Sequence, residues 1–249
     1  MGQCQTFTAQ EFDYLREGGK ILRGALELVS ASVKPGVTTA ELDVIAEEYI
    51  RSHHGAEPGF KGYHGFPATL CTSINEVCVH GIPSDRTLDD GDIISVDCGV
   101  LMHGLYTDAC FTAPVGSISS EAQNLLDVTE GALNEAQKML KAGVRVGDIS
   151  STVQQYAESH GYTVVRSLTG HGLGTDLHQF PDIPNFGELG TGPELPAGTL
   201  VAIEPIIAMG DYHVVQSSDG WTLSMKDGGL AAHFEHTFAV QTEGCEIIA

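Results

Sequence analysis

The sequence is poor in basic residues. Its 249 residues include 12 Lys and Arg against 33 Asp and Glu, which gives a formal net charge of −21. A duplex or a ribosomal RNA surface would repel such a field, which excludes general nucleic-acid binding as a function class. The acidic residues are scattered and form no block that would indicate a disordered tail. We interpret them as a solvated acidic surface.

Long hydrophobic runs are also missing. No apolar stretch approaches the roughly 18 residues needed to cross a bilayer. The first residues lack the basic start and the apolar segment of a secretory signal. Residues 1–6 fit the loose N-myristoylation pattern, but one acyl chain without a basic segment holds a protein to a membrane only marginally. We therefore expect a soluble protein with no membrane partner.

Cysteine patterns that bind zinc are absent as well. The six cysteines form no C-x-x-C pair and no zinc-ribbon spacing. They lie in apolar segments, where cysteines are mostly free, buried thiols that suit a reducing compartment. We expect a cytoplasmic protein with unpaired cysteines at Cys4, Cys71, Cys78, Cys98, Cys110 and Cys245.

The chain repeats itself at an offset of 107 residues, without gaps. Residues 24–26 align with residues 131–133, and Tyr49 aligns with Tyr156. We therefore expect a single domain over residues 1–249, built from two halves at about 10–115 and 117–247, with the site where the halves meet. The same register pairs His64 with His171 and Asp97 with Glu204.

Each half contains helical patterns followed by strand patterns. Apolar spacing predicts helices at 8–33 and 119–142, each followed by a second helix that Thr39 or Asp148 could cap. Helices separated from strands in this way indicate an α+β fold with helices on one face of an antiparallel sheet. Segments rich in Val, Ile and Thr predict strands at 68–78, 92–100, 106–113, 164–168, 199–207 and 233–240.

Four carboxylates lie inside apolar strand segments: Asp97, Asp108, Glu204 and Glu235. A buried carboxylate without a partner is costly, and it normally takes up a proton or finds a cation. Any one of them could be a strand-end acid facing solvent. Since the few Lys and Arg residues are elsewhere, four together indicate divalent metal. His171 joins them because it and its repeat mate both lie in glycine-rich segments.

This donor set is dominated by oxygen. It suits two Mn²⁺, Fe²⁺ or Co²⁺ ions better than a thiolate site would, with Zn²⁺ as an alternative. Two ions roughly 3.5–4 Å apart can hold a nucleophilic hydroxide and polarise a carbonyl at the same time. The sequence therefore predicts a metal-dependent hydrolase of amides or esters.

Several motifs together resemble the type I methionine aminopeptidases, which have the pita-bread fold. The resemblance implies an enzyme that removes the N-terminal methionine from nascent proteins and peptides whose second residue is small. It also implies nascent-chain N-termini as partners, a transient contact with the ribosome, and a monomer. The motifs lie at residues 16–21, 66–67, 71–83, 91–97, 170–174, 203–205 and 235–237.

The resemblance further implies roles for single residues. Glu204 would carry a proton from water to the leaving amine, His178 would steady the tetrahedral oxyanion, and His80 would contact the scissile amide. The metal ligands would be Asp97, Asp108, His171, Glu204 and Glu235. The pocket for the methionine side chain would be lined by Tyr63, His64, Phe66, Cys71 and Trp221.

The sequence departs from the family pattern at three positions. Leu177 stands where the family often has an aromatic residue, Gln179 where it usually has Glu, and His233 where it often has Gln. No departure removes a ligand. One alternative is an Xaa-Pro aminopeptidase or prolidase-like hydrolase of the same fold, which the run at 75–83 and the chain length disfavour. Another is a non-catalytic pita-bread binding protein, which the complete ligand set disfavours.

Overall fold

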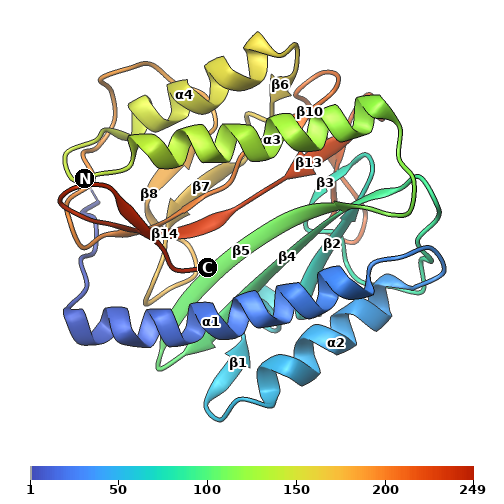
Figure 1. The fold of residues 1–249 in the computed structure, drawn as a ribbon, viewed down its shortest axis with the longest axis horizontal. Coiled ribbons are helices and arrows are strands. Elements are labelled where there is room, and N and C mark those ends of the chain that lie inside the picture. Colours follow the sequence, from blue (N-terminus) through green and yellow to red (C-terminus); the bar gives the residue numbers. More distant parts are fainter. Residues whose placement is uncertain (1) are drawn as a thin grey trace.

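Two pairs of long helices cover one side of the strands (Figure 1). The structure, a computed structural model, describes residues 2–249. The first pair is α1 (Ala9–Ser32) and α2 (Thr39–Arg51), and the second is α3 (Ser120–Met139) and α4 (Val146–Ser159). At the 107-residue offset, α1 and α3 end at equivalent residues, and α2 and α4 begin at equivalent residues. The sequence repeat is therefore a repeat of structure.

The two helix pairs are also packed in the same way. A Cβ atom at Gly24 would overlap the hydroxyl group of Tyr49, so α1 and α2 can approach closely only because residue 24 is glycine. Gly131 and Tyr156 repeat this contact between α3 and α4. The aligned sequence identities thus record an equivalent helix–helix contact in each half.

The residues that cap α2 and α4 differ from the prediction. The N-cap of α2 is Thr38, not Thr39: its hydroxyl accepts from Glu41 N at 3.2 Å, and its N–H donates to the Glu41 carboxylate at 2.8 Å. This reciprocal capping box needs Glu three residues after the cap, a spacing that selects Thr38. Asp148 lies inside α4 and is not its N-cap. Its carboxylate accepts a hydrogen bond from the backbone N–H of Arg145, the N-cap residue, at 3.1 Å.

All strand pairs in residues 2–249 are antiparallel and form four sheets. The first belongs to the N-terminal half: β5 (Leu105–Pro114) lies along one edge of β4 (Ile93–Met102), and β1 (Ala56–Pro58) and β2 (Leu70–Ile74) share the other. The second has the order β15 (Cys245–Ile247), β14 (His236–Val240), β9 (Leu200–Ile203), β7 (Thr169–Gly172), β8 (Gln179–Pro184).

The two remaining sheets have three strands each. One has the order β13 (Ala231–His233), β10 (Ile206–Ala208), β6 (Thr163–Val164). The other has the order β11 (Val214–Gln216), β12 (Leu223–Met225), β3 (Val77–Val79), and so joins strands of both halves. A short 3₁₀ helix, η1 (Tyr63–Gly65), precedes β2.

Four predicted strands are shorter or interrupted. The segment 199–207 breaks at Glu204-Pro205 and the segment 233–240 at Phe234-Glu235, whereas only Val164 of 164–168 is in a strand. Proline cannot donate to a ladder, which explains the first break. Both breaks release a glutamate from regular pairing. The predicted segment 68–78 also divides, at Asn75-Glu76, into β2 and β3. The sequence did not predict six of the strands, which are β1, β7, β8, β11, β12 and β15.

The halves meet where β5 runs beside residues 231–240 (Figure 1). Asp108 N donates to Thr237 Oγ1 at 3.0 Å, and Thr112 Oγ1 donates to His233 O at 2.7 Å. Each helix pair has its own buried core, one around Leu22 and Ile50 and the other around Leu125 and Phe238. Among residues 2–249, no helix is long and apolar enough to cross a membrane.

Candidate metal centre and substrate cavity

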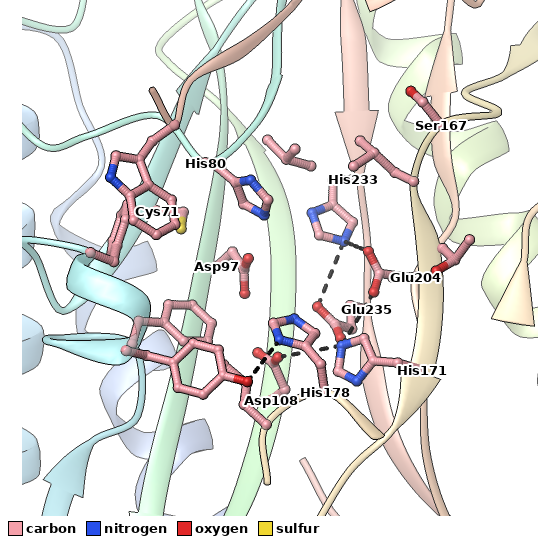
Figure 2. A pocket seen from close by; sticks show the side chains of 18 residues that line it. Cys71, His80, Asp97, Asp108, Ser167, His171, His178, Glu204, His233 and Glu235 are labelled. Atoms are coloured by element: carbon pink, nitrogen blue, oxygen red, sulfur yellow. Dashed lines mark hydrogen bonds and ion pairs between the residues drawn. The ribbon is translucent and has the colours of Figure 1, made fainter. Parts of the chain in front are cut away.

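A cavity of about 220 Å³ opens at the junction between the halves. Figure 2 shows His80 and Asp97, from the first half, facing His171, Glu204 and His233 from the second. Neither half provides both walls, so the cavity requires the tertiary contact between them. This agrees with the prediction that the site lies where the repeated units meet.

The first two carboxylates come from neighbouring strands. Asp97 on β4 lies opposite Cys110 on β5, and Asp108 on β5 lies opposite Gly99 on β4. Because side chains alternate along a strand, residues two apart point to the same face, and Asp97 and Asp108 therefore share one face of the sheet. Asp108 is buried, and Asp97 is partly exposed to the cavity.

The other two carboxylates come from the strand breaks of the second half. Glu204 follows β9, and Glu235 lies between β13 and β14. Glu235 N donates to Cys110 O at 2.9 Å, which joins the glutamate to β5 and brings it beside Asp108. The breaks that shortened the predicted strands are thus the positions that turn glutamates toward the cavity.

His171 on β7 completes the group. Its Nε2 lies 3.5 Å from Glu204 Oε1 and 4.0 Å from Asp108 Oδ2. Donor atoms of Asp108, His171 and Glu235 all lie within 4.8 Å of one another. The structure therefore brings together all five residues for which the sequence predicted metal binding, from β4, β5, β7 and the two breaks.

Burial and mutual repulsion keep these carboxylates from ionising easily. Burial, followed by the charges of neighbouring acids, raises the pKa of Asp108, Glu204 and Glu235 well above the usual range. Burial also raises the pKa of Asp97 to about 7, and lowers that of His171 to about 3. A cluster of this kind is stable as anions only when cations offset its charge.

The polar atoms of the cluster test whether metal fits. Among residues 2–249, buried Asp97 Oδ1, Asp108 Oδ1 and Glu235 Oε1 have no hydrogen-bond partner. Buried polar atoms are nearly always paired, so unpaired carboxylate oxygens that converge on one cavity need an explanation. Carboxylate oxygens and a neutral imidazole are suitable ligands for divalent ions such as Mn²⁺, Fe²⁺, Co²⁺ and Zn²⁺. The donor set fits divalent metal.

His233 is the residue of this centre whose position the sequence analysis missed. Its Nε2 lies 3.7 Å from Glu204 Oε2 and 3.6 Å from Glu235 Oε2, and this nitrogen has no hydrogen-bond partner in the described chain. Burial lowers its pKa to about 3, so the ring is neutral. The alternation of His233 and Glu235 along the segment was the signal available, since it places both on one face.

Four of the five residues predicted to hold a methionine side chain line the cavity: Tyr63, Phe66, Cys71 and Trp221. The rings of Phe66 and Trp221 meet edge to face, with centroids 5.1 Å apart. His64 does not line the cavity. It is exposed in η1 with φ at 47°, and its ring packs on Tyr63. Phe60 and Leu177, which the prediction did not include, complete the apolar wall.

Two further histidines border the cavity. His80 is held at a positive φ of 58°, and burial lowers its pKa to about 4. His178 lies at the rim, with its ring centroid 4.4 Å from that of His171 and its Nδ1 3.4 Å from the Tyr63 hydroxyl oxygen. Both predicted catalytic histidines therefore face the same space as the carboxylates.

Comparison with known proteins agrees with this geometry. The profile of metallopeptidase family M24 matches residues 13–242. The chain belongs to metallopeptidase family M24. This membership confirms the family resemblance in the sequence and the expectation of a metal-dependent peptide hydrolase.

Relatives within the family cover the whole chain. A methionine aminopeptidase of Clostridium perfringens is 48% identical over 96% of this chain and 95% of its own length. The crystal structure of methionine aminopeptidase from Thermotoga maritima superposes with a TM-score of 0.97 at 40% identity, covering 99% of both chains. Xaa-Pro dipeptidase from Bacillus anthracis shares the fold at 22% identity and a TM-score of 0.80, with 98% of this chain matched to 61% of that one. The predicted pita-bread fold is confirmed.

Proposed function

We propose that this chain is a methionine aminopeptidase that removes the N-terminal methionine from peptides and nascent proteins whose second residue is small. Similarity to enzymes of that name over almost the whole chain supports the assignment. The observation that carries it is the cavity itself, in which an apolar, aromatic wall adjoins a cluster of buried carboxylates and histidine.

The five predicted ligands would hold two divalent ions, for which Mn²⁺, Fe²⁺ and Co²⁺ are the best candidates and Zn²⁺ an alternative. When bound, the ions would lower the pKa of water and polarise the scissile carbonyl. Four carboxylates balance the charge of two divalent ions, which supports this number. The ligands are Asp97, Asp108, His171, Glu204 and Glu235.

The chain's own residues would move the proton and orient the substrate. Glu204 is the acid–base group, because its carboxylate faces the cavity beside His171, where a positioned carboxyl can take a proton and pass it to the leaving amine. His80 borders the cavity where the scissile amide would lie. The family resemblance gave His178 the role of steadying the oxyanion, but burial lowers the pKa of this histidine, and a neutral ring whose Nδ1 donates to Tyr63 has no proton on Nε2 to donate. We propose instead that Nε2 of His178, at the rim, accepts a hydrogen bond from the substrate.

The shape of the cavity explains the proposed specificity. A methionine thioether is flexible and packs well on aromatic rings, which Phe66, Trp221 and Tyr63 supply. The same cavity places this aromatic wall directly beside the carboxylate cluster. Bulk at the second substrate residue would then keep the scissile bond away from Glu204 and its neighbours.

The remaining parts of the proposal concern the cellular setting. We propose that residues 1–249 act as a single catalytic domain and as a monomer, because both halves contribute to one cavity. Free cysteines support a cytoplasmic location, and nascent-chain N-termini are the partners, with a transient ribosome contact and neither a specific nucleic acid nor a membrane. The start Met1-Gly2 fits the specificity, so intact-mass analysis is expected to find Met1 removed; this residue lies outside the described ones.

The experiment compares the tripeptides Met-Ala-Ser and Met-Leu-Ser with the dipeptide Ala-Pro, using protein reconstituted stepwise with each metal. Met-Ala-Ser is expected to be cleaved by wild type, while Glu204→Gln loses about 10²-fold or more in kcat because the proton carrier is gone. The matched control is Glu130→Gln, on the exposed face of α3. Equal cleavage of Met-Leu-Ser, cleavage of Ala-Pro in preference, or full activity of Glu204→Gln would overturn the proposal. Metal content measured on each sample tests the number of ions separately.

A further inference from the structure

A chain of hydrogen bonds reaches His178 from outside the cavity. The Tyr63 hydroxyl donates to Asp176 Oδ1 at 3.0 Å, and the Tyr63 oxygen lies 3.4 Å from His178 Nδ1, a contact marked by the dashed line that meets His178 in Figure 2. Tyr63 belongs to the first half, whereas Asp176 and His178 belong to the second. The contact therefore ties the segment that carries His178 to the opposite half.

The directions of these bonds follow from the number of protons. An ionised carboxylate can only accept, so the single proton of the Tyr63 hydroxyl is donated to Asp176. Burial and the neighbouring Asp176 carboxylate raise the pKa of Tyr63 to about 12, so the hydroxyl keeps that proton. The Tyr63 oxygen then acts as the acceptor for His178, whose Nδ1 must carry hydrogen. Nε2 is left unprotonated, as the nitrogen that can accept a hydrogen bond from the substrate.

Asp176 is itself fixed in place. Its Oδ1 also accepts from Leu177 N at 2.8 Å, and its own N–H donates to Gln179 Oε1 at 3.0 Å. Since a backbone N–H can only donate, Gln179 must present its oxygen there and its NH₂ on the other side. That NH₂ donates to Gln5 Oε1 at 2.6 Å, which also accepts from Thr175 Oγ1 at 2.9 Å. Gln179 is one of the three departures from the family pattern.

The N-terminal segment that supplies Gln5 is packed firmly. Phe7 is buried, and its N–H donates to Gly198 O at 2.9 Å. Its ring occupies the space that a Cβ at Gly174 would need, directly before the segment that carries Asp176 and His178. Gly174 in turn accepts from Tyr106 N at 2.7 Å. Gln5 thus extends from a well-anchored base.

We propose that Asp176 is a positioning residue for His178, that it acts through the Tyr63 hydroxyl, and that Gln179 and Gln5 hold Asp176 in place. The proposal rests on the function proposed above. Asp176 is not among the residues that line the cavity. It sets the direction of the Tyr63 hydroxyl, and that direction sets the ring orientation and the tautomer of His178.

The first test is a double-mutant cycle on Met-Ala-Ser, in which kcat and KM are measured separately for wild type, Asp176→Ala, Tyr63→Phe and the double variant. Asp176→Ala is expected to lower kcat about tenfold, as for loss of a charge-assisted hydrogen bond, with KM changed less than about twofold. In the Tyr63→Phe background the same change is expected to lower kcat less than about twofold. The proposal would be overturned if the kcat losses of the two single variants multiplied in the double variant, or if Asp176→Ala left kcat unchanged.

Matched variants separate positioning from folding and from charge. Asp127→Ala removes the same charge from the exposed face of α3 and is expected to leave kcat unchanged. Asp176→Asn retains an oxygen acceptor and is expected to recover most of the kcat lost in Asp176→Ala. Gln5→Ala is expected to lower kcat about threefold, whereas Gln3→Ala, at an exposed residue of the same segment, is not. Equal effects of the two glutamine variants would refute the role of Gln5.

A spectroscopic measurement decides the matter without relying on activity. In zinc-loaded, ¹⁵N-histidine-labelled protein, His178 is assigned by its loss in His178→Ala. In wild type, the ¹⁵N signal of His178 Nδ1 is expected in the range of a protonated nitrogen. In Asp176→Ala and in Tyr63→Phe, this signal is expected to move toward the range of an unprotonated nitrogen. An Nδ1 signal that neither substitution moves would overturn the positioning role. If wild type cleaves no Met-Ala-Ser, the proposed function fails, and the tautomer measurement still tests Asp176.

Discussion

Asp97 offers a direct test of whether the carboxylate cluster needs a cation. In metal-free protein, burial raises the pKa of this side chain to about 7, whereas it is near 3.9 in an unfolded chain. The unfolded state therefore releases its proton first as pH rises. The folded state therefore loses stability progressively between about pH 4 and pH 7, and above pH 7 it bears the full free-energy cost of the buried, ionised Asp97. Asparagine at this position is nearly the same size and carries no charge, so it removes the cost.

The size of the effect follows from the difference in pKa. About three pKa units at 1.36 kcal/mol each give an upper value of about 4 kcal/mol. Because Asp97 is partly exposed to the cavity, water screens the charge, and we expect about 2–4 kcal/mol. Metal-free Asp97→Asn is therefore expected to be more stable than metal-free wild type by this amount at pH 8, and equally stable at pH 4.

The assay is urea unfolding of metal-free protein at a series of pH values, followed by the same series with divalent metal. Only the difference between variant and wild type is interpreted, because surface acids affect both proteins equally. Asp127→Asn, on the outer face of α3, is the control and is expected to show no difference that depends on pH. Added metal is expected to stabilise wild type more than Asp97→Asn, because the variant lacks one anionic donor. Identical pH profiles for Asp97→Asn and wild type would refute the reasoning.

Three further predictions concern packing and reactivity around the site. A Cβ at Gly172 would overlap the backbone oxygen of Phe180. Gly172→Ala is therefore expected to lower the free energy of unfolding in urea by about 1–3 kcal/mol and, in calorimetric titration, to weaken metal binding at the adjacent His171. Unchanged results in both measurements would contradict this. Phe238 is fully buried in the core beneath α3 and α4. Phe238→Ala is expected to lower the free energy of unfolding in urea by about 3–5 kcal/mol, and a loss below about 1 kcal/mol would argue against this packing role. Burial raises the pKa of the Cys71 thiol, so Cys71 is expected to resist alkylation by iodoacetamide at pH 8 until the protein unfolds. Mass spectrometry measures the alkylation, and rapid modification of Cys71 in native protein would disprove this.

The sequence was most informative where a residue conflicts with its local surroundings. Asp97, Asp108, Glu204 and Glu235 stand out because a carboxylate in an apolar strand is costly wherever that strand is buried. The internal repeat added His171 and indicated the junction of the halves. These signals are local or periodic, and the structure places all of the predicted metal ligands around one cavity.

Details that depend on hydrogen bonding were less predictable. Thr38 and Thr39 are equally plausible caps by residue type, and only the reciprocal bonds to Glu41 favour Thr38. The family resemblance implied that His64 lines the methionine pocket, but this residue lies in the exposed η1 turn with a backbone φ of 47°, outside the wall. Backbone conformation at a single residue is a weak sequence signal.

By itself, therefore, the sequence determined which side chains could not be buried without a cation and how often the chain repeats. Only the tertiary structure decided that His233 joins the cluster, within 3.7 Å of two glutamates, and that Asp176 faces Tyr63 across the junction of the halves. Those contacts join residues far apart in the chain. They depend on how two packed halves are oriented, a property that no local pattern of residues encodes.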